Sequence, residues 1–126
     1  FPSDAAGAYV RAVYANAHGE HQQVLDALKI VFRQDRNHAA SLLLQGETQQ
    51  ATGDHEQAVA SLRRYHRLEP DNPVGRKLFA EALLESGQPE RALELLEADK
   101  DAVFKDPEYA TLLARAATEA EKQSAE

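Results

Sequence analysis

Cysteine is absent from this chain of 126 residues. Its absence excludes disulfides, thiolate metal ligands and cysteine nucleophiles together, and it leaves the redox compartment open. The chain also lacks any apolar run near the roughly 20 residues that span a bilayer, so we expect no direct membrane insertion. It begins with "FPSD", without an initiator methionine or a signal-like segment. We therefore expect it to be an excised or processed piece of a longer protein.

The chain has no excess of positive charge in either half. The net charge is −7. Residues 1–67 contain as many basic as acidic side chains, so the whole negative excess lies in residues 68–126. Nucleic-acid binding requires a basic surface that displaces counterions from phosphates. We therefore expect no nucleic-acid partner.

The sequence restarts at one fixed interval, which is marked by Gly19, Gly53 and Gly87. The same register aligns Gln23 with Gln57 and Arg91, Val24 with Ala58 and Ala92, Leu28 with Leu62 and Leu96, Asp35 with Glu69, and Asn72-Pro73 with Asp106-Pro107. So many coincidences in one register indicate an internal repeat.

Each repeat divides at its glycine into two patterns with helical spacing. Asp54 is placed to cap a helix together with Gln57, as in a capping box, and Asn72 and Asp106 are N-cap residues that precede prolines. No segment alternates at period two, so no sheet is expected. The patterns predict seven helices, at about 4–17, 20–34, 38–51, 54–68, 72–86, 88–98 and 106–122.

Two rows of small residues predict how these helices pack. One row lies on the first helix of each repeat (Ala12, Gly46, Ala80, Ala114), and the other lies on the second helix (Val24, Ala58, Ala92). Small side chains let paired backbones approach closely. Because one helical hairpin cannot bury its apolar face alone, successive hairpins must stack on one another. We therefore predict an all-α fold of stacked helix pairs.

The sequence resembles tetratricopeptide repeats (TPRs). The resemblance rests on the length of the repeat, on Gly46 with Ala58, on the segment from Leu62 to the "LEP" that ends at Pro70, and on "ESGQPERALELLE". The resemblance implies a right-handed α-solenoid in a single domain, residues 1–126. The implied units are about 5–38, 39–72 and 73–106, with a terminal helix at 107–122. Asp99 and Phe104 depart from the family pattern, so we expect the helix to fray or kink over residues 98–105.

A longer stretch, "YHRLEPDNPVGRKLFAEALLESGQPERALELL", resembles TPR lipoproteins of bacterial exosortase and exopolysaccharide systems. That narrower resemblance would imply a bacterial periplasm or cell envelope as the location. Without it, the cytoplasm is the expected compartment.

Catalytic, cofactor and metal signals are weak. His18 and His21 straddle the Gly19 turn, so they do not share a helical face as a metal-binding pair would. The serines lack a G-x-S-x-G elbow, and the dispersed glycines form no phosphate-binding loop. The carboxylates fall where a solvated helix surface needs charge. We predict no metal, no cofactor and no enzymatic activity.

The TPR resemblance implies a concave groove that is lined by the first helix of each unit and holds a protein or peptide partner. The residues carried over to this groove are Tyr9, Val13, Asn16, Leu43, Glu47, Gln50, Lys77, Glu81, Leu84, Thr111 and Arg115. The mixture suits a peptide with both apolar and charged side chains. Glu47 and Glu81 stand where the clamp of chaperone-tail-binding TPRs would need positive or amide groups, so that specialisation is not expected.

The main alternative is a structural or oligomerisation segment of a longer TPR array, which stacks on further repeats or on another copy. Apolar Tyr9, Val10 and Val13 on the first helix predict weak self-association through the terminal helices. The outer helices also carry a charge ladder that runs from basic to acidic: Lys29, Arg63 and Glu97, and Arg33, Arg67 and Asp101. Solubility alone is sufficient to explain the ladder. The more specific hypothesis is contact between chains or docking of a charged partner.

Overall fold

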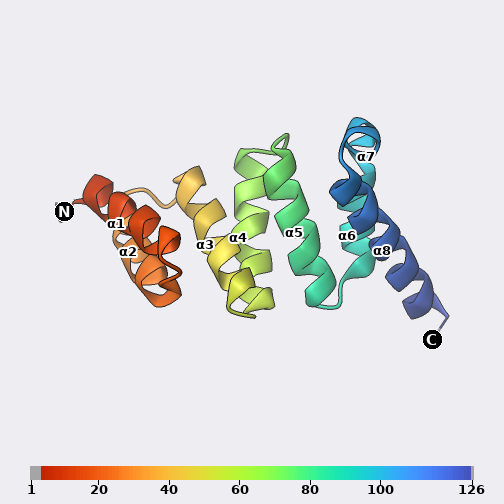
Figure 1. The fold of residues 1–126 in the computed structure, drawn as a ribbon, viewed down its shortest axis with the longest axis horizontal. Helices are drawn as coiled ribbons and strands as arrows, with labels where there is room; N and C mark the ends of the chain where they lie inside the picture. The colour runs from red at the N-terminus through yellow and green to blue at the C-terminus, as the bar shows by residue number, and fades with distance from the viewer. Residues whose placement is uncertain (1–3, 126) are drawn as a thin grey trace.

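A computed structural model describes residues 4–125 of the chain, and all of its regular structure in this range is helical (Figure 1). The helices stand side by side in chain order, with α1 and α8 at opposite ends of the row. Their bounds are α1 Ala5–Ala17, α2 His21–Gln34, α3 Ala39–Ala51, α4 His55–Leu68, α5 Pro73–Glu85, α6 Pro89–Glu97, α7 Lys100–Lys105 and α8 Pro107–Ser124.

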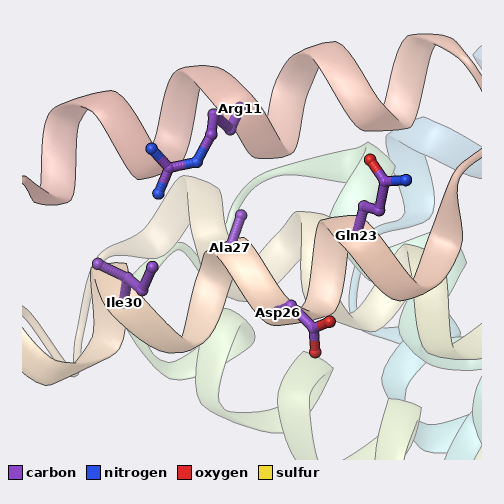
Figure 2. A pocket seen from close by; sticks show the side chains of 5 residues that line it. All are labelled: Arg11, Gln23, Asp26, Ala27 and Ile30. Carbon is purple, nitrogen blue, oxygen red and sulfur yellow. The ribbon is translucent and has the colours of Figure 1, made fainter. Parts of the chain in front are cut away.

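Glycines make the turns that fold the helices into pairs α1–α2, α3–α4 and α5–α6. Gly19, Gly53 and Gly87 have φ angles of 68°, 84° and 80°, the left-handed region that a residue with a Cβ rarely adopts. The helices of each pair then lie against one another, as Figure 2 shows for α1 and α2, where Arg11 of α1 and Ala27 of α2 line one hollow. The stacked pairs form an α-solenoid, as predicted.

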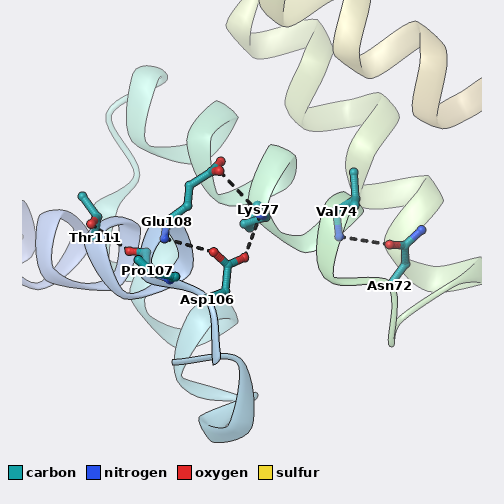
Figure 3. Close-up of polar contacts among 7 residues, drawn as sticks. All are labelled: Asn72, Val74, Lys77, Asp106, Pro107, Glu108 and Thr111. Atoms are coloured by element: carbon teal, nitrogen blue, oxygen red, sulfur yellow. Dashed lines mark hydrogen bonds and ion pairs between the residues drawn. The ribbon is translucent and has the colours of Figure 1, made fainter. Parts of the chain in front are cut away.

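Two of the three predicted N-caps are confirmed. Asn72 Oδ1 accepts a hydrogen bond from the Val74 amide at 3.0 Å, and Asp106 Oδ1 accepts one from the Glu108 amide at 3.0 Å (Figure 3). The prediction of a capping box at Asp54 is wrong, since the Asp54 side chain makes no capping hydrogen bond.

The tight turn after Gly53 explains that failure. It leaves Asp54 with ψ of 70°, well below the extended value near which N-cap side chains fold back onto the helix. Gln57 also has another partner, because its side-chain oxygen accepts a hydrogen bond from Gln49 Nε2 at 3.3 Å.

The small residues pack between paired helices as predicted, with one exception. Ala12 and Ala80 are fully buried, and a Cβ added to Gly46 would lie only 2.5 Å from Leu62 Cγ. Ala114, the fourth member of the row, is exposed. No helix of residues 4–125 packs on that side of α8, so the prediction of a buried Ala114 is wrong.

The described part of the chain has two separate apolar cores. The first joins α1 and α2 and centres on Ala12, Val24 and Leu28. The second extends through α4, α5, α6 and α8 and includes Leu62 and Tyr109. The boundary between these cores falls at α2 and α3, so the first helix pair is joined to the rest less extensively than the later pairs are to one another.

The expected kink over residues 98–105 is present, but it produces eight helices instead of seven in the described part of the chain. α6 ends at Glu97, and Asp99 starts the short α7 by accepting a hydrogen bond from the Ala102 amide at 3.1 Å. Asp99 also forms an ion pair with Arg76 at 3.3 Å. Arg76 is buried in α5, so a carboxylate at this position gives it the partner that a buried cation requires.

Candidate functional site

A hollow of ≈ 260 Å³ lies between α1 and α3. Five of the predicted groove residues line it: Tyr9, Val13, Asn16, Leu43 and Glu47. Helical spacing explains their convergence, since residues three and four positions apart share one face of a helix. Ala40 and Leu44 complete the lining and were not predicted, although both lie on the same helix as Leu43.

The hollow has an apolar floor and polar edges. Leu43 is half-buried against the second core, while Leu44 packs against the first, so the hollow spans the boundary between them. Val13 leaves 47% of its surface exposed there. Asn16 and Glu47 are exposed. This arrangement can accept an apolar side chain while the edges hydrogen-bond to a backbone or to a polar neighbour.

Aromatic contact fixes one side of the hollow. The Tyr9 ring stands edge-on to the ring of His38, with centroids 5.1 Å apart. His38 in turn caps α3, where its Nδ1 accepts a hydrogen bond from the Ser41 amide at 3.3 Å. The start of α3 is therefore anchored on α1 at the place where the hollow opens.

Lys77, one of the predicted groove residues, is already paired with carboxylates of the same chain. Its Nζ lies 2.8 Å from Asp106 Oδ2 and 3.7 Å from Glu108 Oε2 (Figure 3). The hydrogen bond to Asp106 raises the pKa of Lys77, and the same bond lowers the pKa of Asp106. The start of α8 thus neutralises Lys77 and ties α5 to α8.

The remaining charges at this end of the predicted groove form a network that is rich in acid. Arg115 bonds to Glu85 and to Glu119, each at 2.9 Å. Half-buried Glu81 has a raised pKa because burial disfavours its charged form, and the nearby Glu108 carboxylate adds to this effect. The cations on this surface are therefore already paired within the described chain, and acidic groups outnumber them.

Three other predicted groove residues do not line the hollow. Gln50 shares a hydrogen bond of 2.8 Å with His55. Thr111 is exposed and donates its hydroxyl to the Pro107 carbonyl at 2.8 Å (Figure 3). Leu84 is only 5% exposed and belongs to the second core, so its placement on an open groove is wrong. The end of α8 lies close to this end of α5, which a single repeat's sequence does not reveal.

Metal-binding and membrane-spanning features are absent from residues 4–125. No group of three or more histidine and carboxylate side chains is placed to hold a metal ion. None of the helices in this range combines the length and the apolar character needed to cross a membrane.

A family model described as "Tetratricopeptide repeat" matches residues 49–116, more than half of the chain. The chain belongs to the tetratricopeptide repeat family. A comparison with curated protein sequences found no significant match. Nothing in the comparisons supports the narrower resemblance to exosortase or exopolysaccharide lipoproteins.

Solved TPR structures resemble the whole solenoid. The TPR2B domain of yeast Sti1, solved as a complex with pHsp70, has a TM-score of 0.77 at 14% identity over 90% of this chain and 96% of its own. A double mutant of MamA from RS-1 has a TM-score of 0.84 at 24% identity, over 94% of this chain and 66% of its own. The Yersinia enterocolitica chaperone SycD, solved with a peptide of the translocator YopD, has a TM-score of 0.71 at 21% identity, over 95% and 93%. The TM-scores show a shared fold, and at identities this low the likeness extends to the fold alone.

Proposed function

We propose that this TPR domain is a non-catalytic scaffold that binds an extended segment of a partner protein in the α1–α3 hollow. The observation that carries the proposal is the convergence of Tyr9, Val13 and Leu43 around one solvent-open cavity with polar edges. Two proteins with similar folds are described as complexes with such ligands: Sti1 with pHsp70, and SycD with a YopD peptide.

The hollow would take one or two apolar side chains of the ligand. A volume of ≈ 260 Å³ is smaller than most pockets for small organic ligands, which favours a side chain over a metabolite. From the hollow, the ligand would run along the first helices toward α5 and α8. There it would meet Glu81 and the paired Lys77 and Arg115, so a free carboxylate would find no open cation.

The direct test is selection of binding peptides from a random display library, followed by measurement of affinity for a selected peptide. Replacing Val13 by Ser and Glu47 by Lys changes the floor and the edge of the hollow at exposed positions, so stability should change little. Affinity should fall tenfold or more, since each 1.4 kcal/mol corresponds to about one decade.

A matched control makes the same two kinds of change on α4, with Leu68 replaced by Ser and Glu56 by Lys. Both of these side chains are exposed and lie outside the hollow. The control should bind as the unmodified protein does. Equal loss in both double variants, or loss only in the control, would overturn the proposed site.

A second candidate function is stacking on another copy or on a further repeat. Val10 is 48% exposed on α1, while Leu44 and Leu78, its equivalents in the second and third repeats, are packed against apolar cores. The face of α1 that carries Val10 therefore matches a surface that is covered in the later units. Light scattering distinguishes this role, because stacking raises the apparent mass with concentration whereas a peptide-binding monomer keeps its mass.

A further inference from the structure

A second type of hollow recurs on the outer surface of the solenoid, between the second helices of successive units. One, of ≈ 390 Å³, is lined by Lys29, Phe32, Arg33, Arg36, Gln45 and Arg64. Another, of ≈ 540 Å³, is lined by Arg63, His66, Phe79, Arg91, Glu94, Leu95 and two further apolar residues, so its arginines outnumber its single carboxylate. Lys29 and Arg63 occupy the same position in successive repeats, as do Phe32 and His66, so the two outer hollows are equivalent places in the solenoid.

Among the described residues, the arginines that line these outer hollows lack the ion pairs made by cations elsewhere, whereas Lys29 forms one with Asp26 at 3.7 Å. Arg76, Lys77 and Arg115 all contact carboxylates. Among the described residues, Arg33 and Arg36 form no ion pair. These two arginines of the α2–α4 hollow are therefore left for a partner.

Backbone and aromatic contacts hold two further arginines in place without neutralising them. Arg64 Nη2 donates to the carbonyl oxygen of Arg36 at 2.5 Å. The Arg63 guanidinium lies 6.0 Å from the centroid of the Phe79 ring, a cation–π contact. Both arginines line the hollows and are held by these contacts, so less side-chain entropy is lost when an anion binds.

The equivalent hollow at the first helix pair differs from these two in the charge of its lining. It measures ≈ 270 Å³ and is lined by Arg11, Gln23, Asp26, Ala27 and Ile30 (Figure 2). This lining contains one arginine and one carboxylate, and the carboxylate, Asp26, is also the ion-pair partner of Lys29. The surplus of cations is thus a property of the α2–α4 and α4–α6 hollows, not a general consequence of stacking helix pairs.

We propose that the two basic outer hollows form a second binding site, which takes an acidic peptide segment with interspersed apolar side chains. Arginines pair with carboxylates through two parallel hydrogen bonds, and half-buried Phe32 and Leu95 offer apolar surface between the charges. Glu94 lines the far side of the second hollow, and Glu97 follows it on α6. A phosphate backbone that continued past the hollows would be repelled there, whereas a short peptide ends before it.

The test uses a fluorescein-labelled peptide in which glutamate alternates with leucine, with fluorescence anisotropy as the readout. The peptide should bind, and binding should weaken as salt screens the charges. Replacing Arg33 and Arg36 by Glu should lower affinity at least tenfold. Replacing Arg63 and Arg91 by Glu should also weaken binding, because both belong to the second hollow.

The control variant replaces Lys105 and Lys122 by Glu, which changes the net charge equally at exposed positions outside the outer hollows. It should retain affinity, as should the Val13 and Glu47 double variant of the α1–α3 hollow. Failure of the unmodified protein to bind the peptide would overturn the proposal, as would equal loss in the lysine control. Equal binding of a peptide with glutamine for glutamate, or tighter binding of a short oligothymidine, would overturn it as well.

Discussion

At the scale of single residues, buried Arg76 is linked to the break between α6 and α7. Its equivalents in the other repeats are the apolar Ala8, Leu42 and Ala110. A cation in such a place needs partners, and Arg76 has the Pro70 carbonyl at 2.6 Å and the Asp99 carboxylate at 3.3 Å. Asp99 can meet Arg76 because it lies at the break between α6 and α7 and not inside a continuous helix.

Replacing Asp99 by Ala should therefore destabilise the domain. The change removes the carboxylate partner of buried Arg76 and the cap of α7, and we expect a loss of about 2 kcal/mol in the free energy of unfolding. Urea denaturation measures it. Asp101, exposed on the same short helix, is the control, and its replacement by Ala should cost less than about 0.5 kcal/mol. Similar costs at both positions would contradict the role given to the ion pair.

At the scale of helices, small side chains set the distance between partners. Ala92 on α6 is fully buried in the second core. Its repeat equivalents, Val24 and Ala58, are fully buried as well. The close approach of the paired helices therefore leaves little room for added side-chain volume at this place.

Replacing Ala92 by Leu should overpack the interface between α5 and α6 and cost about 1–3 kcal/mol. The melting temperature in a circular dichroism experiment should fall accordingly. Replacing Glu90 by Leu, on the exposed side of the same helix, should leave the melting temperature nearly unchanged. An unchanged melt for the Ala92 variant would mean that the helix pair is packed differently from the structure described.

At the scale of the whole molecule, the two cores divide the solenoid unevenly. The core of α1 and α2 meets the larger core mainly through α3, where Leu44 packs on one side and Leu43 on the other. The α1–α3 hollow lies at this junction. The binding site that we propose would therefore be adjacent to the part of the fold that separates most easily.

We expect the first helix pair to open before the rest, as repeat proteins do when one interface is weaker than its neighbours. Hydrogen exchange followed by mass spectrometry should show faster exchange for amides in α1 and α2 than for amides in α5 and α6. A peptide bound in the α1–α3 hollow should slow exchange in α1, because it would contact both sides of the junction. Uniform exchange rates along the chain would contradict the division into two cores.

The sequence by itself determined the features that depend on local backbone chemistry. Gly19 turns the chain because its φ is positive, and Asn72 caps α5 through the amide of Val74. The recurrence of these signals at one fixed interval was sufficient for the helix pairs, their stacking and the family. It also placed Tyr9, Val13 and Leu43 on one surface, because helical periodicity fixes which side chains share a face.

Only the tertiary structure decided which of these surfaces are open and which charges are free. Lys77 on α5 meets Asp106, the N-cap of α8, and Leu84 is buried in the core shared with α6 and α8. Such outcomes depend on distances between helices that are far apart in sequence, and a repeat pattern records each helix without recording what lies across from it.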